Sequence, residues 1–346
     1  MCPSYIEAPP TFFSWFQLHL AQRGRTLPSI QFDITMIRRF IVNTFLRLSI
    51  KSLWNRFPSV AKVRNRFAWA DRLNTLGRRA PPMQEEEVDG VRIEWIGRTP
   101  DVTQGVIMYV HGGAFSLRGT HTDRRFCADM ARRTGLPVVL VAYRLAPEFP
   151  FPAGLNDCCR IYAWLQERGT AAQRIVMLGH SAGANLILGT MMRARQNGMD
   201  QPAGAVLLSP PTDLTGSNPS ITSNLKSDSM FTPITWPWVR QYYLGGTCRS
   251  APEASPLFGH WSGLAPLQFH VSDTELAFDD SRLAVERARA AGTDAELIVW
   301  SDVPHSFAFI DLLPEAARCR AQIAQFVARI QLGPLSNAGA KANMRN

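Results

Sequence analysis

From residue 91 onward, the chain alternates short apolar runs with longer amphipathic segments. The apolar runs are rich in β-branched residues and predict strands; they lie at residues 91–95, 106–110, 137–143, 174–179, 203–209, 267–272 and 295–300. Amphipathic segments of helical length lie between most of them, at residues 122–134, 154–168, 182–197, 279–291 and 315–331. Strands that are apolar throughout and alternate with helices predict an α/β fold, with a mostly parallel central sheet and helices on both faces.

Residues 212–250 interrupt this alternation. They follow a strand and contain no simple helix that leads back to the sheet. Ligands of open α/β sheets bind at the carboxyl ends of the strands, where an insertion of this kind forms a lid. We therefore expect a cap whose large side chains either line a substrate pocket or only fill the cap's own core. The pocket candidates are Phe115, Met230, Phe231 and Trp236.

The first 80 residues form a different region, in which the pattern predicts helices with polar breaks and no alternating strands. Pro81-Pro82 and the acidic run 85–87 mark a boundary, so the catalytic domain is expected over residues 81–332 and the first region as part of the cap. Between Met36 and Trp54 apolar residues recur at helical spacing, but basic residues interrupt them. This favours an amphipathic helix over a membrane span.

The two ends of the chain carry little that predicts a location or a fold. Residues 11–20 are apolar but lack the basic start and the cleavage site of a secretory signal. Residues 333–346 have the composition of a flexible tail. The six cysteines form no C-x-x-C pair, so we expect free thiols, no metal site and a cytoplasmic location.

Charge separates the first 80 residues from the rest. They hold 13 Lys and Arg against three acidic residues, a sum of +10, whereas the whole chain carries +9. No motif that reads nucleic acid accompanies this charge, so a nucleic-acid partner is not expected. Two interpretations of the basic segment stay open: a solvated helix face, or a surface that contacts anionic lipid.

The strongest chemical signal is the pentapeptide Gly179-His180-Ser181-Ala182-Gly183. It matches G-x-S-x-G, follows a predicted strand and precedes a predicted helix. In that context the small residues permit a sharp turn that lifts a serine hydroxyl above the sheet edge. Ser181 is therefore the candidate nucleophile.

A glycine pair follows another predicted strand, at Gly112-Gly113, and Ala114 comes next. Backbone N–H groups in such a loop can bind the negative charge that develops on an attacked carbonyl oxygen. We expect an oxyanion hole formed by Gly112, Gly113 or Ala114 together with Ala182.

A serine nucleophile needs a histidine base and an acid that orients it. Of the histidines that follow Ser181, only His305 lies in a loop after a predicted strand, so it is the candidate base. Asp273 directly follows another strand and is the candidate acid. Asp279 and Asp280 begin a helix, where capping explains them, and Asp302 lies too close to His305 in the sequence.

The chain resembles the hormone-sensitive-lipase-like branch of the α/β-hydrolase esterases, and in particular microbial acetyl-ester and lactone hydrolases. The resemblance rests on HGGAF (111–115), YRLAPEFPFPA (143–153), GHSAGANL (179–186), SPPTDLTG (209–216), SDTELAFDDS (272–281) and PHSF (304–307). It implies an α/β-hydrolase fold, a Ser181–His305–Asp273 triad, the oxyanion hole above and a helical cap over the pocket. The chain departs from the family at Ala114, where a third glycine is usual, and at His180, where aspartate is common.

Three functions are compatible with these residues. The first is hydrolysis of apolar carboxylic esters of short or medium acyl chain, or of lactones, without a metal or organic cofactor. The second is a thioesterase or acyltransferase of a biosynthetic pathway with the same triad. The third is a non-catalytic small-molecule receptor on the same fold, against which the retained His305 argues. The expected partner is a small-molecule ester, while membrane contact and a homodimer stay open.

Overall fold

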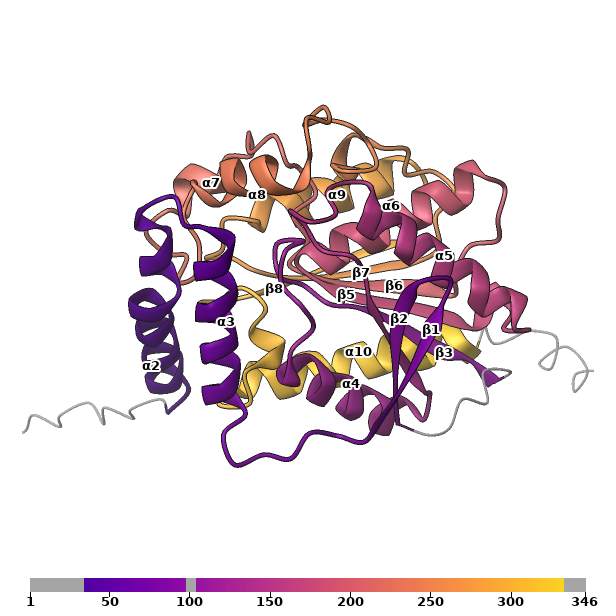
Figure 1. Cartoon of the computed structure of the whole chain (residues 1–346), viewed down its shortest axis with the longest axis horizontal. Coiled ribbons are helices and arrows are strands. Elements are labelled where there is room, and N and C mark those ends of the chain that lie inside the picture. The colour runs from indigo at the N-terminus through magenta and orange to yellow at the C-terminus, as the bar shows by residue number, and fades with distance from the viewer. Residues whose placement is uncertain (1–33, 98–103, 333–346) are drawn as a thin grey trace, which may run out of the picture. The chain divides into compact units, whose positions relative to one another are not determined.

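The computed structural model describes residues 34–97 and 104–332, and contains the predicted alternation of strands and helices (Figure 1). By packing, the chain divides into two units, residues 1–37 and residues 38–346, and the second holds the whole sheet. The predictions for residues 11–20 and for the tail, residues 333–346, lie outside the described residues.

The predicted sheet is confirmed, and within the described residues it has eight strands in the order β1-β2-β4-β3-β5-β6-β7-β8. β1 and β2 are antiparallel to their neighbours, and the strands from β4 to β8 are parallel. The strands are β1 (Met83–Val88), β2 (Val91–Ile96), β3 (Val106–Val110), β4 (Val138–Ala142), β5 (Ile175–His180), β6 (Gly204–Leu208), β7 (Leu267–Ser272) and β8 (Ala295–Trp300).

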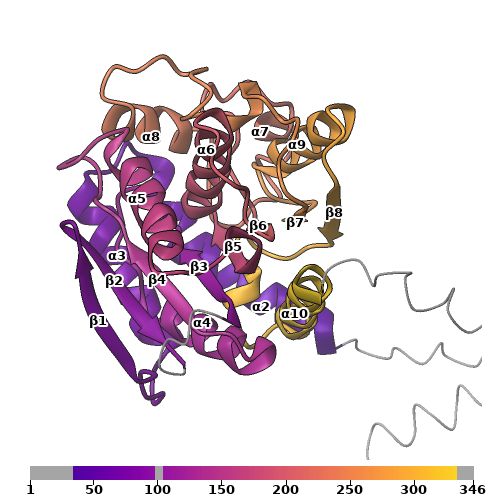
Figure 2. The same ribbon diagram turned by 90° about the vertical axis from the view of Figure 1, so that its right-hand side faces the viewer.

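Helices cover both faces of the sheet (Figure 2). Because successive strand residues point to opposite faces, Met108 and Val110 join one buried apolar cluster and Ile107 and Tyr109 the other. One face carries α4 (His121–Thr134) and α10 (Pro314–Leu332), and the other carries α5 (Ala153–Glu167), α6 (Ala182–Gln196) and α9 (Phe278–Ala290). These five helices lie within two residues of the predicted bounds.

The structure adds one strand that the pattern does not predict. The acidic run 85–87, interpreted above as a boundary, lies in β1, which pairs with β2 at the edge of the sheet. Most of its side chains face solvent, so it lacks the apolar pattern of the other strands. Charged residues on an edge strand prevent pairing with other chains, which explains an acidic sequence there.

Two groups of helices lie over one end of the sheet (Figure 1). The insertion contains α7 (Ser220–Ser223) and α8 (Thr235–Tyr243), and the N-terminal region contains α2 (Ile34–Ser49), η1 (Lys51–Asn55) and α3 (Val60–Asn74). The groups touch, because Trp54 packs edge-on against Trp238 at 5.4 Å and Trp238 Nε1 donates to the Pro58 carbonyl at 2.7 Å. In the described part of the chain, no helix combines the length and apolarity that crossing a bilayer requires.

Candidate active site

Ser181 occupies the turn between β5 and α6, as the pentapeptide predicts. Its backbone has φ 51° and ψ −126°, a conformation that costs energy for a residue with a side chain. Its N–H donates to the Leu208 carbonyl of β6 at 2.8 Å, and its own carbonyl accepts from Ala184 and Asn185. The strained residue is therefore fixed from both sides at the carboxyl end of the central strands.

The glycines around Ser181 permit this turn. A Cβ on Gly183 would lie 2.0 Å from the Val110 carbonyl oxygen of β3, and one on Gly179 would lie 2.7 Å from Ile187 Cδ1. Gly183 in particular meets main chain, which cannot move aside as a side chain can. The pentapeptide thus packs the start of α6 directly against the end of β3.

The loop after β3 is placed beside this turn by the register of the sheet, because Val110 pairs with Gly179. Gly113 has φ 113°, and both Ala114, at φ 50°, and Phe115, at φ 60°, adopt positive φ. Ala114 therefore takes the conformation that a third glycine would favour. The N–H groups of Gly112, Gly113 and Ala114 meet no acceptor in the described part of the chain.

Ala182 begins α6, so its N–H has no acceptor within the helix. It directly follows Ser181 in the chain. Backbone N–H groups without acceptors are the kind of donor that an oxyanion hole uses, and the positive end of the α6 dipole adds to the field at Ala182.

His305 lies in the loop after β8 and is buried. Its Nδ1 lies 2.5 Å from Oε2 of Glu275, which is also buried. An ionised carboxylate only accepts, so Nδ1 carries the hydrogen and Nε2 is the acceptor atom of the neutral ring. Nε2 is buried and has no hydrogen-bond partner among the described residues.

Glu275 is held by further hydrogen bonds. Its Oε1 accepts from the Ser209 hydroxyl at 2.8 Å and from the Ser272 N–H at 2.7 Å. These donors come from the ends of β6 and β7, the two strands nearest to it. A carboxylate fixed in this way orients the imidazole and stabilises the positive charge the ring gains during proton transfer.

The prediction that Asp273 is the acid is wrong. Asp273 is exposed, and its Oδ1 accepts from the Asp302 N–H at 3.0 Å instead of meeting His305. After β7 the chain turns so that Asp273 points to solvent, while Glu275, two residues later, folds back beneath the strand ends. Asp279 and Asp280 accept from the N–H groups of Ser220 and Asp213 and so attach the cap insertion.

His180 links the two halves of this site. Its Nε2 lies 3.0 Å from Asp123 Oδ1 and its Nδ1 lies 3.0 Å from Ser306 Oγ, so the neighbours of Ser181 and His305 in the chain are joined. Burial opposes ionisation of Asp123, but the bonds from His180 and Thr120 keep its pKa well below the usual range. Gly112 lies against the His180 ring, which a Cβ there would approach to 2.5 Å.

These features agree with comparisons to known proteins. Residues 107–309 match the family model described as alpha/beta hydrolase fold. The chain belongs to this family. The match includes the Ser181 turn, the glycine loop, Glu275 and His305, and the predicted fold class is confirmed.

Relatives and structural neighbours of this α/β-hydrolase are esterases. An esterase from Acinetobacter venetianus is 33% identical over 245 residues, 70% of this chain and 80% of the relative. An acetyl-hydrolase from Streptomyces hygroscopicus is 31% identical over 239 residues, 69% of this chain and 80% of the relative.

Among solved structures, an esterase from the bacterial hormone-sensitive lipase family has a TM-score of 0.78 and 33% identity, and covers 86% of this chain and 98% of its own. The predicted resemblance and the predicted enzyme class, a carboxylic ester hydrolase, are thereby confirmed.

The four predicted pocket residues have different surroundings in this hydrolase. Phe231 packs edge-on against His305 at 4.9 Å and is the one that touches the catalytic candidates. Phe115, directly after the glycine loop, is buried and stacks on Tyr243 of α8 at 3.7 Å. Met230 lies in the core cluster on the α10 face, and Trp236 packs with Ile221 of the insertion and with Leu276, which follows β7.

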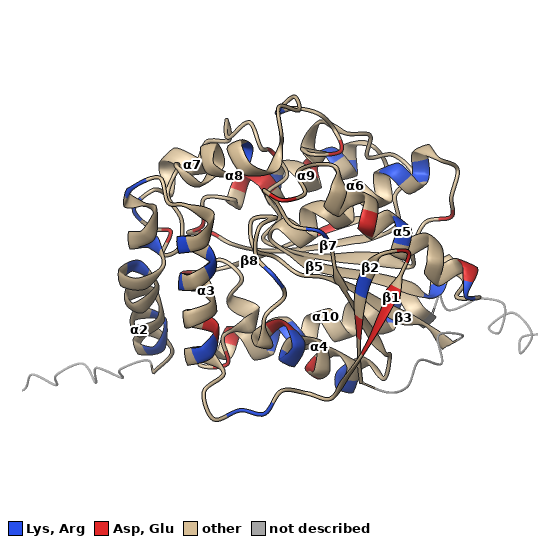
Figure 3. Ribbon diagram, in the orientation of Figure 1, with Lys and Arg blue, Asp and Glu red and all other residues tan. Residues whose placement is uncertain are grey.

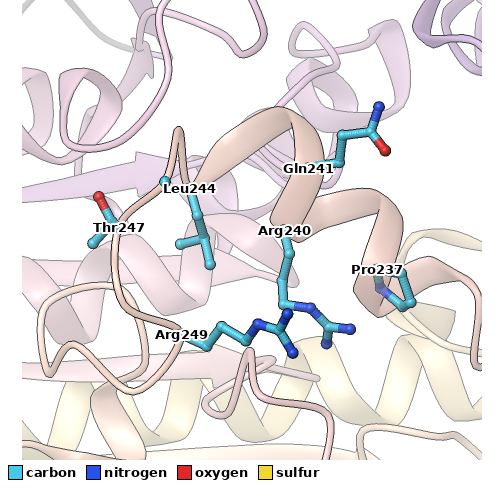
Figure 4. Close-up of a pocket in the computed structure, with 7 residues that line it drawn as sticks. Pro237, Arg240, Gln241, Leu244, Thr247 and Arg249 are labelled. Atoms are coloured by element: carbon cyan, nitrogen blue, oxygen red, sulfur yellow. The ribbon is translucent and has the colours of Figure 1, made fainter.

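A cavity of about 400 Å³ lies elsewhere, on α8 and the loop after it (Figure 4). Arg240 and Arg249 line it, and Arg240 donates to the carbonyls of Leu214 and Thr215. None of the catalytic candidates Ser181, Glu275 and His305 lines it. We therefore do not assign it to the reaction.

Sequence reasoning missed Glu275 and the Asp123–His180 pair. Glu275 lies within the quoted segment 272–281, so weighing every carboxylate of that segment would have included it. The Asp123 partner of His180 has no such signal, because it comes from α4, 57 residues earlier in the sequence.

Proposed function

We propose that the protein hydrolyses carboxylic esters of short or medium acyl chain, or lactones, through an acyl-enzyme on Ser181. His305 is the general base, Glu275 orients it, and N–H groups of Gly112, Gly113 or Ala114 and of Ala182 bind the oxyanion. The observation that carries the proposal is the buried His305–Glu275 pair, whose free Nε2 lies in the loop tied to the strained Ser181 turn.

The first half of the reaction follows from these groups. His305 Nε2 takes the proton from the Ser181 hydroxyl as its oxygen attacks the ester carbonyl, and Glu275 stabilises the imidazolium that results. The tetrahedral intermediate places its negative oxygen on the backbone donors. When it collapses, His305 gives the proton to the leaving alcohol, and the acyl group stays on Ser181.

The second half repeats the same steps with water. His305 removes a proton from water, the hydroxide formed attacks the acyl-enzyme, and the proton returns to Ser181 as the acid leaves. No electron transfer is required, and each proton moves through His305. A thiol leaving group or an alcohol acceptor would use the same residues, which is why a thioesterase or acyltransferase stays the alternative.

The surroundings favour an apolar substrate of modest length. Phe231 presents an aromatic ring to His305, and Phe115, which directly follows the glycine loop, stacks on Tyr243 of the cap. The Streptomyces relative is named an acetyl-hydrolase, which supports a short acyl group.

The experiment is turnover of p-nitrophenyl esters from acetate to decanoate, with a lactone and a thioester, by wild type, Ser181→Ala and Ser301→Ala. Ser301 is exposed and lies near His305 in the sequence, so its variant controls for loss of a hydroxyl. We expect Ser181→Ala to lose several orders of magnitude in kcat and Ser301→Ala to match wild type. A folded wild type that cleaves only the thioester, or nothing in the panel, would overturn the proposal.

A further inference from the structure

Helices α2 and α3 expose large apolar side chains. Phe40 is 70% exposed, Leu48 is 74% exposed and Leu76, just after α3, is 78% exposed. Soluble proteins seldom leave such residues grouped in solvent, and grouped ones mark interaction sites. We call this group the α2–α3 surface and define it by Phe40, Ile41, Phe45, Leu48, Trp69 and Leu76.

The α2–α3 surface is continuous across the two helices. Phe45 of α2 stacks on Trp69 of α3 at 6.1 Å, and Arg66 Nη1 donates to the Ser49 carbonyl at 3.0 Å. The opposite sides of the two helices pack against the rest of the protein, because residues such as Val42 and Val63 are buried in the two core clusters. The exposed side is therefore a second apolar face, additional to the one that packs on the body.

Positive charge surrounds this face. Residues 38–79 hold eleven Lys and Arg against one acidic residue, Asp71, a sum of +10. Arg39, Arg64 and Arg78 pair with carboxylates elsewhere in the fold. The other eight have no carboxylate partner in the part of the chain that the structure describes, and we call these eight the basic rim. Figure 3 shows this basic character on both helices.

We propose that the α2–α3 surface docks the protein on an anionic lipid bilayer. Apolar side chains that enter the interface, with Lys and Arg at the headgroups, are the combination that binds such a surface. A second copy would bring an equal positive charge against the first. Residues 1–33 have two acidic residues and two arginines, so they offer no net charge to balance the basic rim.

The surface lies beside the cap segment that reaches His305. Arg47 Nη2 donates to the Ser227 carbonyl at 3.0 Å and Lys51 Nζ donates to the Leu225 carbonyl at 2.8 Å. Trp54, next along the chain, packs near Phe231, and Phe231 touches His305. If the proposed ester hydrolysis holds, docking brings the cap segment that contacts His305 close to apolar esters dissolved in the bilayer, but docking itself does not depend on that reaction.

The test is co-sedimentation of the full chain with vesicles of phosphatidylcholine alone or with about 30 mol% phosphatidylglycerol. An apolar variant carries Phe40→Ser, Leu48→Ser and Leu76→Ser, and a charge variant carries Lys62→Gln, Arg72→Gln and Arg79→Gln. The matched controls are Leu312→Ser, an apolar residue 47% exposed elsewhere, and Arg174→Gln, an exposed arginine outside the basic rim. Thermal unfolding shows that each variant is folded.

We expect the wild type and both controls to bind the anionic vesicles at least tenfold more tightly than the neutral ones. Raising NaCl from about 0.05 M to about 0.5 M should weaken this binding, and either triple variant should weaken it at least tenfold. Absence of wild-type binding, or triple variants that bind as the wild type does, would overturn the proposal. A dimer in sedimentation equilibrium that the apolar variant dissociates, without vesicle binding, would assign the surface to a second copy. None of these readouts requires turnover, so failure of the proposed reaction remains distinguishable.

Discussion

His180 Nδ1 lies 3.0 Å from Ser306 Oγ, and this contact joins the residue before the proposed nucleophile to the residue after the proposed base. His180 is held in turn by Asp123 at 3.0 Å and by the ring of Phe309 at 4.4 Å. The contact involves no reacting atom. It sets how the loop that carries His305 lies against the Ser181 turn, so His180 and Ser306 are positioning residues.

Replacing Ser306 with alanine should therefore lower kcat more than it changes KM. The lost hydrogen bond has a net worth of about 1 kcal/mol, which corresponds to roughly a fivefold to tenfold fall in rate if it is lost mainly from the transition state. Steady-state kinetics on the best p-nitrophenyl ester, with kcat and KM separated, measures this effect.

Ser301→Ala is the control for this measurement, because Ser301 is an exposed serine of the same connection. A Ser306→Ala variant with wild-type kcat and a raised KM would contradict the positioning role. A fall in the unfolding midpoint with unchanged kcat would show that the contact serves stability alone.

The contact of His305 with Glu275, and not with Asp273, gives a second prediction. Glu275→Gln keeps the shape of the side chain but removes the charge that holds the His305 tautomer, so kcat should fall by on the order of 10³-fold to 10⁴-fold. Asp273→Asn is the matched control, because it neutralises an exposed carboxylate two residues away. Its kcat should stay within about twofold of wild type, as expected for a group outside the reaction. The reverse order of effects would return the acid to Asp273.

The order of strands and helices along the chain could be predicted because each parallel strand is a continuous run of apolar residues. The predicted strands at 106–110 and 174–179 correspond to β3 and β5, and the glycine motifs at their ends hold the proposed nucleophile and the proposed oxyanion loop. The pentapeptide is a local sequence signal, although the carbonyl that Gly183 approaches belongs to Val110 of β3. Local rules therefore predicted where Ser181, His305 and the loop at Gly112 lie in the fold, and their roles in the reaction remain part of the proposal.

The acid could not be predicted in the same way, since several carboxylates follow β7. Which of them reaches His305 depends on how the turn at residues 273–275 folds back, and on the Ser209 hydroxyl, which comes from the end of β6. Ser209 lies 66 residues from Glu275 in the sequence. A tertiary contact over that distance leaves no periodic signal, and the same holds for Asp123 and His180.

Gly183→Ala should destabilise the fold as well as lower activity. The new Cβ would lie 2.0 Å from the Val110 oxygen, and relief requires the start of α6 to move away from β3. Overpacking of this kind costs about 1–3 kcal/mol or more. Gly198→Ala is the comparison, because its φ of +70° is also unfavourable for alanine but its surroundings are open. Urea unfolding should therefore show a larger loss for Gly183→Ala, and equal losses would contradict a steric cause.

A buried carboxyl group outside the active site gives a prediction about pH. Asp280 is fully buried, and its Oδ1 accepts from the Asp213 N–H at 2.7 Å. Burial raises the pKa of Asp280 to about 7, and the nearby charge of Asp213 adds to the shift. The folded state thus keeps a proton that an unfolded aspartate releases near pH 4.

Between about pH 4 and pH 7 the folded chain binds more protons at this site than the unfolded chain, so its contribution to stability falls as pH rises, by up to about 1.4 kcal/mol per pH unit. Above the folded pKa no further loss occurs. Asp280→Asn keeps an acceptor for Asp213 and cannot ionise, so its free energy of unfolding relative to wild type should improve between about pH 5 and about pH 8. Urea unfolding at both values measures the change, with the exposed Asp294→Asn as the control that should show none. An Asp280→Asn difference that is the same at both pH values would mean that Asp280 does not titrate in this window, because only a group with different proton affinities in the two states can produce a pH-dependent difference.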